Sequence, residues 1–355
     1  MDLNLMIEKI SNHYNEKLPF VVYSLPQSGS ISVLLQKNDS LNTIENLGGN
    51  GFVFAPFEYK GFSYFIDEND SEKHQFDFKS EAIESISVAV SEDISEQNTY
   101  IKLLSKTIET IKGSRANKIV ISRFQNFQLK DFSIEKLIIQ LFSKNPTAFR
   151  YIWYHPKTGL WCGATPETLV QIENKSFKTM ALAGTQPFTN QEPVIWGVKE
   201  EYEQQLVTDA IINSLQRVTS VLKVSKTYTH RAGSLLHLRT DISGVLRTGE
   251  ATLAKIAKAL HPTPAVCGSP QQFAQQFIIE NEGYDREFYT GFLGPILDDG
   301  NTASLMVNLR CMKIDDNQAR IFVGGGITLA SQPQEEYEET KNKLQTMLQV
   351  LQPML

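Results

Sequence analysis

Short apolar runs recur along the whole of this sequence, and they predict strands. In the first 112 residues such runs lie at Phe20–Ser24, Ser30–Gln36 and Gly61–Ile66. The piece Leu47–Phe57 is glycine-rich and then strongly apolar, as expected for a turn that leads into a core strand. A helix is predicted around Gln97–Lys112.

From about residue 117 the pattern becomes strand-rich, with helices at irregular intervals. The predicted helices are Val198–Leu222, Pro270–Asn281 and Glu335–Leu351, and two long strands are predicted at Thr302–Lys313 and Ala319–Gly324. Since strands and helices do not alternate regularly, the predicted fold class is α+β. No repeat, low-complexity tract or long Gly/Ser linker marks a boundary, so we expect one large domain over residues 1–355.

The segment Leu260–Gly291 has the most distinctive composition in the chain. Pro262 and Pro264 fix φ and bias the preceding residues towards extended geometry. The helix predicted at Pro270–Asn281 follows, and then a run dense in charged, aromatic and glycine residues. The segment therefore holds two loops at a defined distance, as a binding site requires.

Composition excludes several classes of protein. With 41% hydrophobic residues the chain can build a large core, and its net charge of −6 with no basic stripe argues against nucleic-acid binding. The cysteines, at 162, 267 and 311, are too few and too scattered for a disulfide framework or a zinc site. The start of the chain lacks the apolar core of a signal peptide, and no apolar run approaches the roughly 20 residues that span a membrane. We expect a soluble, cytoplasmic protein.

Two predicted helices carry carboxylates beside their apolar stripes. Glu203 lies one turn before a stripe formed by Val207, Ile211, Leu215 and Val218. It either reaches solvent near the helix N-terminus or is paired or bound to a cation, and spacing leaves both open.

The terminal helix presents Glu336, Glu339 and Lys343 on a stripe separate from its apolar seam. Spacing alone favours a solvated face with a Glu339–Lys343 pair. Two helices that each offer carboxylates would alternatively make an oxygen-only site suited to Mg²⁺.

Five further sites along the chain are candidates for binding or catalysis. Arg310 is expected in mid-strand, where its planar fork suits capture of a carboxylate. The glycines at 324–326, just beyond the next strand, form either a sharp turn or a set of N–H donors to an anion. Lys118 is either an ordinary edge residue or a base with a depressed pKa. Glu167 would need a raised pKa to act as an acid, and His237 is by default a satisfied core histidine.

Taken in order along the chain, the motifs around these residues resemble the chorismate-utilising enzymes: isochorismate, salicylate, anthranilate and aminodeoxychorismate synthases. The resemblance covers about residues 115–350, and residues 1–112 carry no motif of the family. The motifs are KIVISR, GATPETLV, ALAGTQP, KEEYEQQLV, HLRTDISGVL, LHPTPAVCG, DREFYTG, LRCMKI, FVGGGI and EEYEETKNKLQTML.

This resemblance implies one α+β domain with two packed antiparallel sheets flanked by helices, and chorismate, a dicarboxylate, as substrate. It implies Lys118 as the base that activates water and Glu167 as the acid that protonates the leaving 4-hydroxyl. The implied ligands of Mg²⁺ are Glu203, Glu336 and Glu339. The implied substrate-binding residues are Gly184, His237, Ala265, Tyr289, Arg310, Gly325 and Lys343.

Single residues favour one family member, isochorismate synthase. Ala183 stands where aminodeoxychorismate synthases often have a nucleophilic lysine, and Lys118 stands where anthranilate synthases typically have glutamine. Salicylate synthases share the lysine but have threonine in the proline-rich loop, where this chain has Ala265. Tyr289 argues mildly the other way, since some isochorismate synthases have phenylalanine there.

Isochorismate made in this way would supply menaquinone or siderophore synthesis. A monomer without a glutaminase subunit is expected. The alternative from another class is a non-catalytic chorismate-binding subunit, although no acid, base or metal carboxylate is missing. The chain departs from the family at Gln186 and Phe188, where arginines are usual, and at Arg239, where the residue is usually small or apolar.

Overall fold

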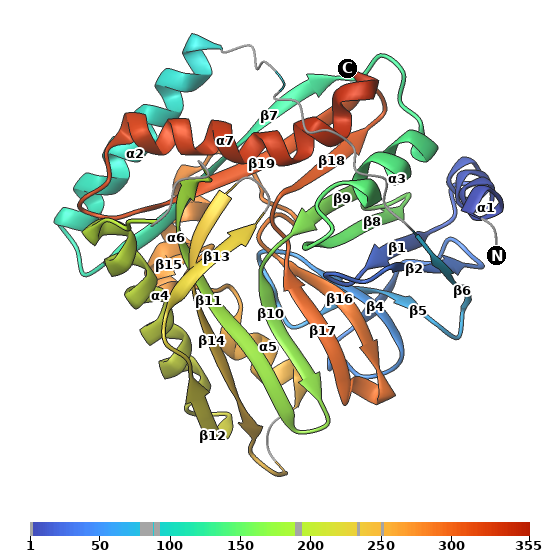
Figure 1. The fold of residues 1–355 in the computed structure, drawn as a ribbon, viewed down its shortest axis with the longest axis horizontal. Helices are drawn as coiled ribbons and strands as arrows, with labels where there is room; N and C mark the ends of the chain where they lie inside the picture. Colours follow the sequence, from blue (N-terminus) through green and yellow to red (C-terminus); the bar gives the residue numbers. More distant parts are fainter. Residues whose placement is uncertain (1–2, 79–87, 89–92, 189–193, 233–234, 250–251) are drawn as a thin grey trace.

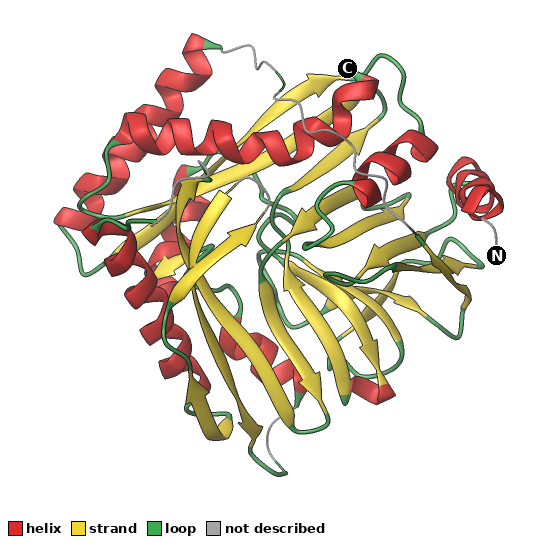
Figure 2. Ribbon diagram, in the orientation of Figure 1, coloured by secondary structure: helices red, strands yellow, loops and turns green. Residues whose placement is uncertain are grey.

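The computed structural model describes residues 3–78, 88, 93–188, 194–232, 235–249 and 252–355. Two large antiparallel sheets face each other, and helices cover their outer sides (Figures 1 and 2). The nine-stranded sheet runs in the order β15 (Gly268–Ser269), β7 (Lys118–Gln128), β19 (Gln318–Ile327), β18 (Cys311–Asp315), β9 (Gly159–Thr165), β8 (Phe149–His155), β1 (Phe20–Ser24), β2 (Ser30–Gln36) and β6 (Ser71–Asp77).

The second sheet has ten strands. Its order is β12 (Thr219–Val224), β14 (Leu235–Leu246), β11 (Ser176–Pro187), β10 (Thr168–Glu173), β17 (Thr302–Val307), β16 (Phe292–Leu297), β4 (Gly51–Ala55), β5 (Ser63–Asp67) and β3 (Asn42–Ile44), with β13 (Tyr228–Ala232) paired to β14. The predicted α+β fold of two packed antiparallel sheets is confirmed.

Seven α-helices are present in the described residues, and α7 lies across β19 (Figure 1). None of them is both long and apolar enough to cross a membrane. They are α1 (Leu3–Asn15), α2 (Ile94–Lys112), α3 (Ile134–Ser143), α4 (Val198–Leu215), α5 (Leu253–Leu260), α6 (Gln271–Asn281) and α7 (Pro333–Leu351).

The nine-stranded sheet packs against helices on one face and against the other sheet on the opposite face. Successive side chains of a strand point to these two faces in turn. On β8, Tyr151 and Trp153 face the other sheet, whereas Ile152 faces the helices α1, α3 and α7. The layer between the sheets is rich in aromatic rings, and Trp161 stacks on Phe322 with centroids 5.3 Å apart. Offset and edge contacts of this kind add to the free energy of burial. This aromatic layer supports the residues that line the cavity between the sheets.

Most predicted elements are confirmed, but several boundaries were wrong. The strands Phe20–Ser24 and Ser30–Gln36 are found as predicted. The helix predicted at Val198–Leu222 ends at Leu215. The β-branched residues that follow favour a strand, and β12 pairs with β14 there. Helices α1, α3 and α5 were not predicted.

The strand predicted at Thr302–Lys313 is two strands in different sheets. β17 belongs to the ten-stranded sheet and β18 to the nine-stranded sheet, so the chain crosses between them at residues 308–310. Arg310 has a φ of 47° and does not lie in mid-strand as predicted. A run of alternating apolar residues cannot reveal such a crossing, because both halves carry the same period of two.

Candidate active site

A cavity lies where the two sheets and the helices α4 and α7 meet. Of the predicted site residues, all but Lys118 and Glu336 line it: Glu167, Gly184, Glu203, His237, Ala265, Tyr289, Arg310, Gly325, Glu339 and Lys343. Segments far apart in the sequence thus converge on one space, as the motif pattern predicted.

Lys118 lies immediately behind the cavity wall. Its side chain is 1% exposed, and its Nζ is 2.8 Å from Glu203 Oε1. β7 is flanked by β15 and β19, so the interpretation of Lys118 as an edge residue was wrong. Glu203 does not reach out to solvent from the helix end either, because this ion pair holds it against β7. A buried ammonium requires such a partner.

Glu167 lies in the turn after β9 and is fully buried. Desolvation raises the pKa of this carboxyl to about 7, against opposing effects of the Thr263 hydrogen bond and the charge of Lys118. The Thr263 hydroxyl donates to Glu167 Oε1 at 3.2 Å. A carboxyl with this pKa keeps a large protonated fraction at neutral pH, which is the direction a general acid needs.

His237 and Arg310 meet on the far side of the cavity. The Arg310 guanidinium donates to His237 Nε2 at 3.4 Å and to the Thr346 hydroxyl at 3.2 Å. His237 Nδ1 therefore carries the proton and donates to the Gly184 carbonyl at 3.0 Å. Desolvation, with the charges of Arg310 and Lys343, lowers the pKa of His237 to about 3. The ring is both a satisfied core histidine and a neutral wall of the cavity.

The glycines at 324–326 lie inside β19 and not beyond it, so the predicted sharp turn was wrong. They pair with residues 120–122 of β7. A Cβ at Gly326 would lie 2.5 Å from both Glu203 Oε1 and Lys118 Cε. Glycine in a strand interior marks a close approach of other groups. Here it makes room for the Lys118–Glu203 pair.

The carboxylates of α7 face this same strand. Lys199 Nζ is 2.6 Å from Glu336 Oε1, and Lys343 Nζ is 2.6 Å from Glu339 Oε1. Lys343 also donates to the Gly324 carbonyl at 2.8 Å. The Glu339–Lys343 pair forms as predicted, but the solvated face favoured by spacing was wrong, because Glu336 is 2% exposed and the pair lines the cavity.

The three glutamates suit a hard cation in chemistry. Among the described residues no three potential ligands are gathered closely enough to hold a metal, because each carboxylate is turned towards a lysine. However, a Cβ at Gly325 would lie 3.3 Å from Glu336 Oε2 and 3.9 Å from Glu339 Oε1, next to the Glu203 oxygen at Gly326. Desolvation and the charge of Glu339 raise the pKa of Glu336. Three carboxylates lie around the glycines of β19, where no side chain intervenes, and this chemistry fits Mg²⁺, which prefers oxygen ligands.

The remaining predicted residues complete the wall. Tyr289 stacks on Phe322 with ring centroids 5.4 Å apart, and burial raises the pKa of its hydroxyl, which stays a hydrogen-bond donor. Gly184 has a φ of 66°, a conformation that favours glycine. Ala265 lies in the loop after α5 and presents only a methyl group to the cavity.

Sequence reasoning missed three partners of the site. Thr263, Lys199 and Thr346 contact Glu167, Glu336 and Arg310 respectively. The position of Thr263 between two prolines and of Lys199 one turn before Glu203 were the available signals.

The departures from the family also find partners. Arg239 pairs with Asp241 at 2.7 Å, and Arg231 lies over the ring of Phe188, 3.7 Å from its centroid. The buried Gln186 Nε2 has no hydrogen-bond partner among the described residues.

Comparison with known proteins agrees with this geometry. Residues 60–352 match the family model described as chorismate binding enzyme. The chain belongs to this family. The chorismate-binding enzymes include the isochorismate synthase EntC of Escherichia coli strain K12, to which the chain is 32% identical over 278 residues, covering 75% of the chain and 70% of EntC.

Two solved structures share the fold. The menaquinone-specific isochorismate synthase MenF of Escherichia coli superposes with a TM-score of 0.78 at 19% identity, over 94% of this chain and 88% of MenF. Anthranilate synthase component I of Streptococcus pneumoniae TIGR4 superposes with a TM-score of 0.68 at 18% identity, over 92% of each chain. Because these two carry different names on one fold, the residues of the site must decide the reaction.

Proposed function

We propose that this protein is an isochorismate synthase that converts chorismate into isochorismate with Mg²⁺. Water attacks C2 of the ring, both ring double bonds shift, and the protonated C4 hydroxyl leaves as water, so substrate and product have the same composition. The observation that carries this proposal is the placement of Lys118 and Glu167 around one cavity, close enough for the lysine's charge to act on the carboxyl. The relative EntC, named an isochorismate synthase, supports it.

Lys118 and Glu167 divide the proton transfers between them. Lys118, once its ammonium has released a proton, takes a proton from the attacking water. Glu167, with a pKa of about 7, gives a proton to the departing hydroxyl. Matching a catalytic pKa to the working pH makes proton transfer efficient in both directions.

The substrate's two carboxylates require separate cationic partners. Arg310, the Tyr289 hydroxyl and backbone N–H groups near Gly325 would bind the enolpyruvyl carboxylate, since a guanidinium and an uncharged hydroxyl both donate. Neutral His237 would lie against the ring and hold Arg310 through Nε2. Lys343 and Gly184 would support substrate placement.

Glu203 and Glu339, with Glu336 beside them, would hold Mg²⁺, which supplies positive charge for the ring carboxylate when bound. Each glutamate must leave its lysine partner to do so. The lysines would keep the carboxylates charged and in place until then.

The residue at position 265 of the proline-rich loop determines which product we expect. Ala265 offers no hydroxyl to hold the ring carboxylate for elimination, so we infer that isochorismate is released and not converted to salicylate. Lys118 at the base position favours water over ammonia, and hence isochorismate over anthranilate.

The test is to incubate purified protein with chorismate and Mg²⁺ and to separate the products. Isochorismate is expected. Salicylate with pyruvate would overturn the argument from Ala265, and anthranilate formed only with ammonia would overturn the role of Lys118. A protein that binds chorismate without turnover would be the non-catalytic subunit. The proposal includes one domain over residues 1–355 acting as a monomer, which sedimentation would check.

A further inference from the structure

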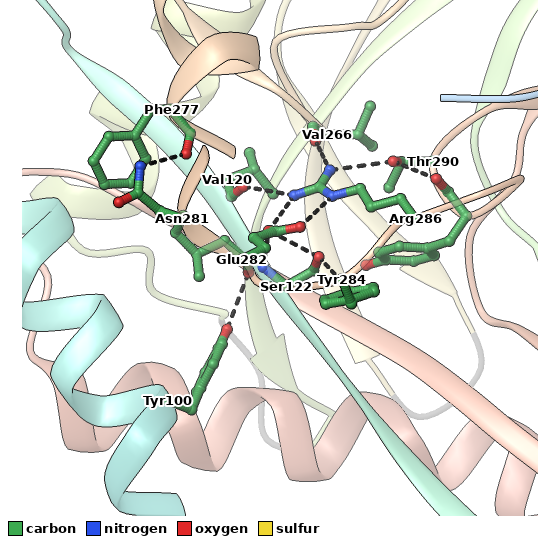
Figure 3. Close-up of polar contacts among 12 residues, drawn as sticks. Tyr100, Val120, Ser122, Val266, Phe277, Asn281, Glu282, Tyr284, Arg286 and Thr290 are labelled. Atoms are coloured by element: carbon green, nitrogen blue, oxygen red, sulfur yellow. Dashed lines mark hydrogen bonds and ion pairs between the residues drawn. The ribbon is translucent and has the colours of Figure 1, made fainter. Parts of the chain in front are cut away.

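A sealed ion pair lies behind the cavity, outside its lining. Glu282 and Arg286 have side chains that are 1% and 2% exposed, and Arg286 Nη2 is 2.5 Å from Glu282 Oε1 (Figure 3). Glu282 follows the last residue of α6, and Arg286 lies four residues further along the chain. Burial disfavours the charge of Arg286, but the Glu282 carboxylate outweighs this and raises the pKa of the guanidinium. The guanidinium therefore stays charged.

Arg286 uses all five of its N–H donors. Nε donates to Glu282 Oε2 at 2.7 Å, and Nη2 donates to Glu282 Oε1 and to the Val120 carbonyl at 2.9 Å. Nη1 donates to the Val266 carbonyl at 2.9 Å and to the Thr290 hydroxyl at 3.2 Å. Val120, Val266 and Thr290 all line the cavity. Figure 3 shows the three contacts spreading from one guanidinium.

Glu282 makes a second set of hydrogen bonds to β7. Its Oε1 accepts from the backbone N–H of Ser122 at 2.7 Å and from the Ser122 hydroxyl at 2.9 Å. Val120 and Ser122 are the next residues after Lys118 on its face of β7, since side chains on one face repeat every second residue. The pair therefore holds the strand that carries Lys118 at two consecutive positions of that face.

We propose that Arg286 is a positioning residue that sets the distance between the strand of Lys118 and the loop of Ala265. This inference rests on the proposed function. The loop contact is the Val266 carbonyl, one residue after Ala265, and the strand contact is the Val120 carbonyl, two residues after Lys118. The contact with Thr290 brings the neighbour of Tyr289 into the same assembly. One rigid, planar fork thus joins three walls of the cavity, which an ammonium could not do.

A purely stabilising role of the Glu282–Arg286 pair predicts a different result. If the pair only holds the fold together, its disruption lowers the unfolding temperature but leaves turnover of the folded enzyme intact. If it positions Lys118, turnover falls even where the enzyme is fully folded. Binding should change less, because Arg286 makes no contact with Arg310, the proposed partner of the enolpyruvyl carboxylate.

The test is Arg286→Lys in the full chain, assayed with chorismate and Mg²⁺ at a temperature well below its measured unfolding midpoint. We expect kcat to fall by about 10- to 100-fold, the order expected for a misplacement near 1 Å, with KM changed less than about threefold. The matched control is Arg150→Lys. Arg150 is equally buried and donates to the Phe142 carbonyl and to the Ser24 hydroxyl, away from the cavity, so its kcat should stay within about twofold.

A kcat of Arg286→Lys within about twofold of the parent, with the same KM, would overturn the inference. If this variant does not fold, Glu282→Gln replaces it, because it keeps the size of the side chain and removes the charge that orients the fork. It is expected to lower kcat by about tenfold, and an unchanged kcat would equally overturn the inference. A parent enzyme that makes no isochorismate would instead refute the proposed function.

Discussion

Glutamates on the two sides of the cavity lie in opposite environments. Glu203 faces the ammonium of Lys118 at 2.8 Å, whereas Glu167 is buried with a threonine hydroxyl as its hydrogen-bond donor. Desolvation raises the pKa of Glu167 to about 7 and helps to lower that of His237 to about 3. One side holds carboxylates in pairs with lysines, and the other keeps His237 neutral and leaves Glu167 with a large protonated fraction at neutral pH.

The difference teaches that partners, not residue types, assign the roles. A carboxylate with a cationic partner remains charged and can bind a metal, while a desolvated one retains its proton and can donate it. The paired side comes from β7, α4 and α7, and the neutral side comes from the turn after β9, the proline-rich loop and β14. The fold brings these two environments together across one cavity.

The largest expected effect comes from breaking the paired side at Lys118. Lys118→Ala should lower kcat by roughly 10²- to 10⁴-fold, because the attacking water loses its base. Steady-state assay of isochorismate formation measures it. Lys144→Ala is the control, since Lys144 is also buried but donates to the Gln349 carbonyl away from the cavity. A Lys118→Ala enzyme with parental kcat would remove this residue from the mechanism.

On the neutral side, Glu167→Gln should lower activity and raise stability. Because the folded pKa is raised from 4.5 to about 7, the parent loses stability as pH rises through this window, and the glutamine variant does not. The gain in unfolding free energy should be near zero at pH 4.5 and roughly 3 kcal/mol at pH 8. Chemical denaturation at both values measures it. Equal gains at both values would contradict a raised pKa of Glu167 in the folded state.

The pH dependence of the parent enzyme follows from the same group. Glu167 donates a proton, so kcat/KM should fall above about pH 7, by about tenfold per pH unit. A pH–rate profile measured with saturating Mg²⁺ shows this limb. A profile that rises steadily through pH 7 to 9 would contradict an acid of this pKa.

Removing a carboxylate from the paired side should weaken the binding of Mg²⁺. Glu339→Gln is expected to raise the Mg²⁺ concentration for half-maximal activity by roughly tenfold or more. Isothermal titration with Mg²⁺ gives an independent readout. Glu338→Gln is the control, because Glu338 is the next residue of α7 and pairs with Lys341 at the surface. If both variants respond alike, Glu339 is not a ligand.

The smallest effect concerns the loop. Ala265→Thr should make a measurable share of turnovers end in salicylate and pyruvate, with kcat reduced only a few-fold, since it adds one hydroxyl to a cavity wall. Pyruvate release, followed by coupled assay, measures the share. The absence of pyruvate would show that Ala265 does not choose the product.

Sequence reasoning reached the fold class and named most of the predicted residues that line one cavity, because both depend on local signals. The motif residues were found one by one, and the strand runs marked the sheets. What failed was long-range. The crossing at Arg310, the burial of Lys118 and the contact of the glycines of β19 with Glu203 depend on which strands become neighbours. The sealed Glu282–Arg286 pair, four residues apart, looks in sequence like an ordinary helical surface pair.

The division of labour between the two sides is tested most directly by the source of the new hydroxyl. Chorismate is incubated with enzyme and Mg²⁺ in water enriched in ¹⁸O, and the isolated isochorismate is examined by mass spectrometry. The mechanism predicts one ¹⁸O atom, at the C2 hydroxyl, because Lys118 activates solvent water while Glu167 releases the original hydroxyl. Isochorismate without ¹⁸O would mean that the hydroxyl migrates within the substrate, and would contradict the account.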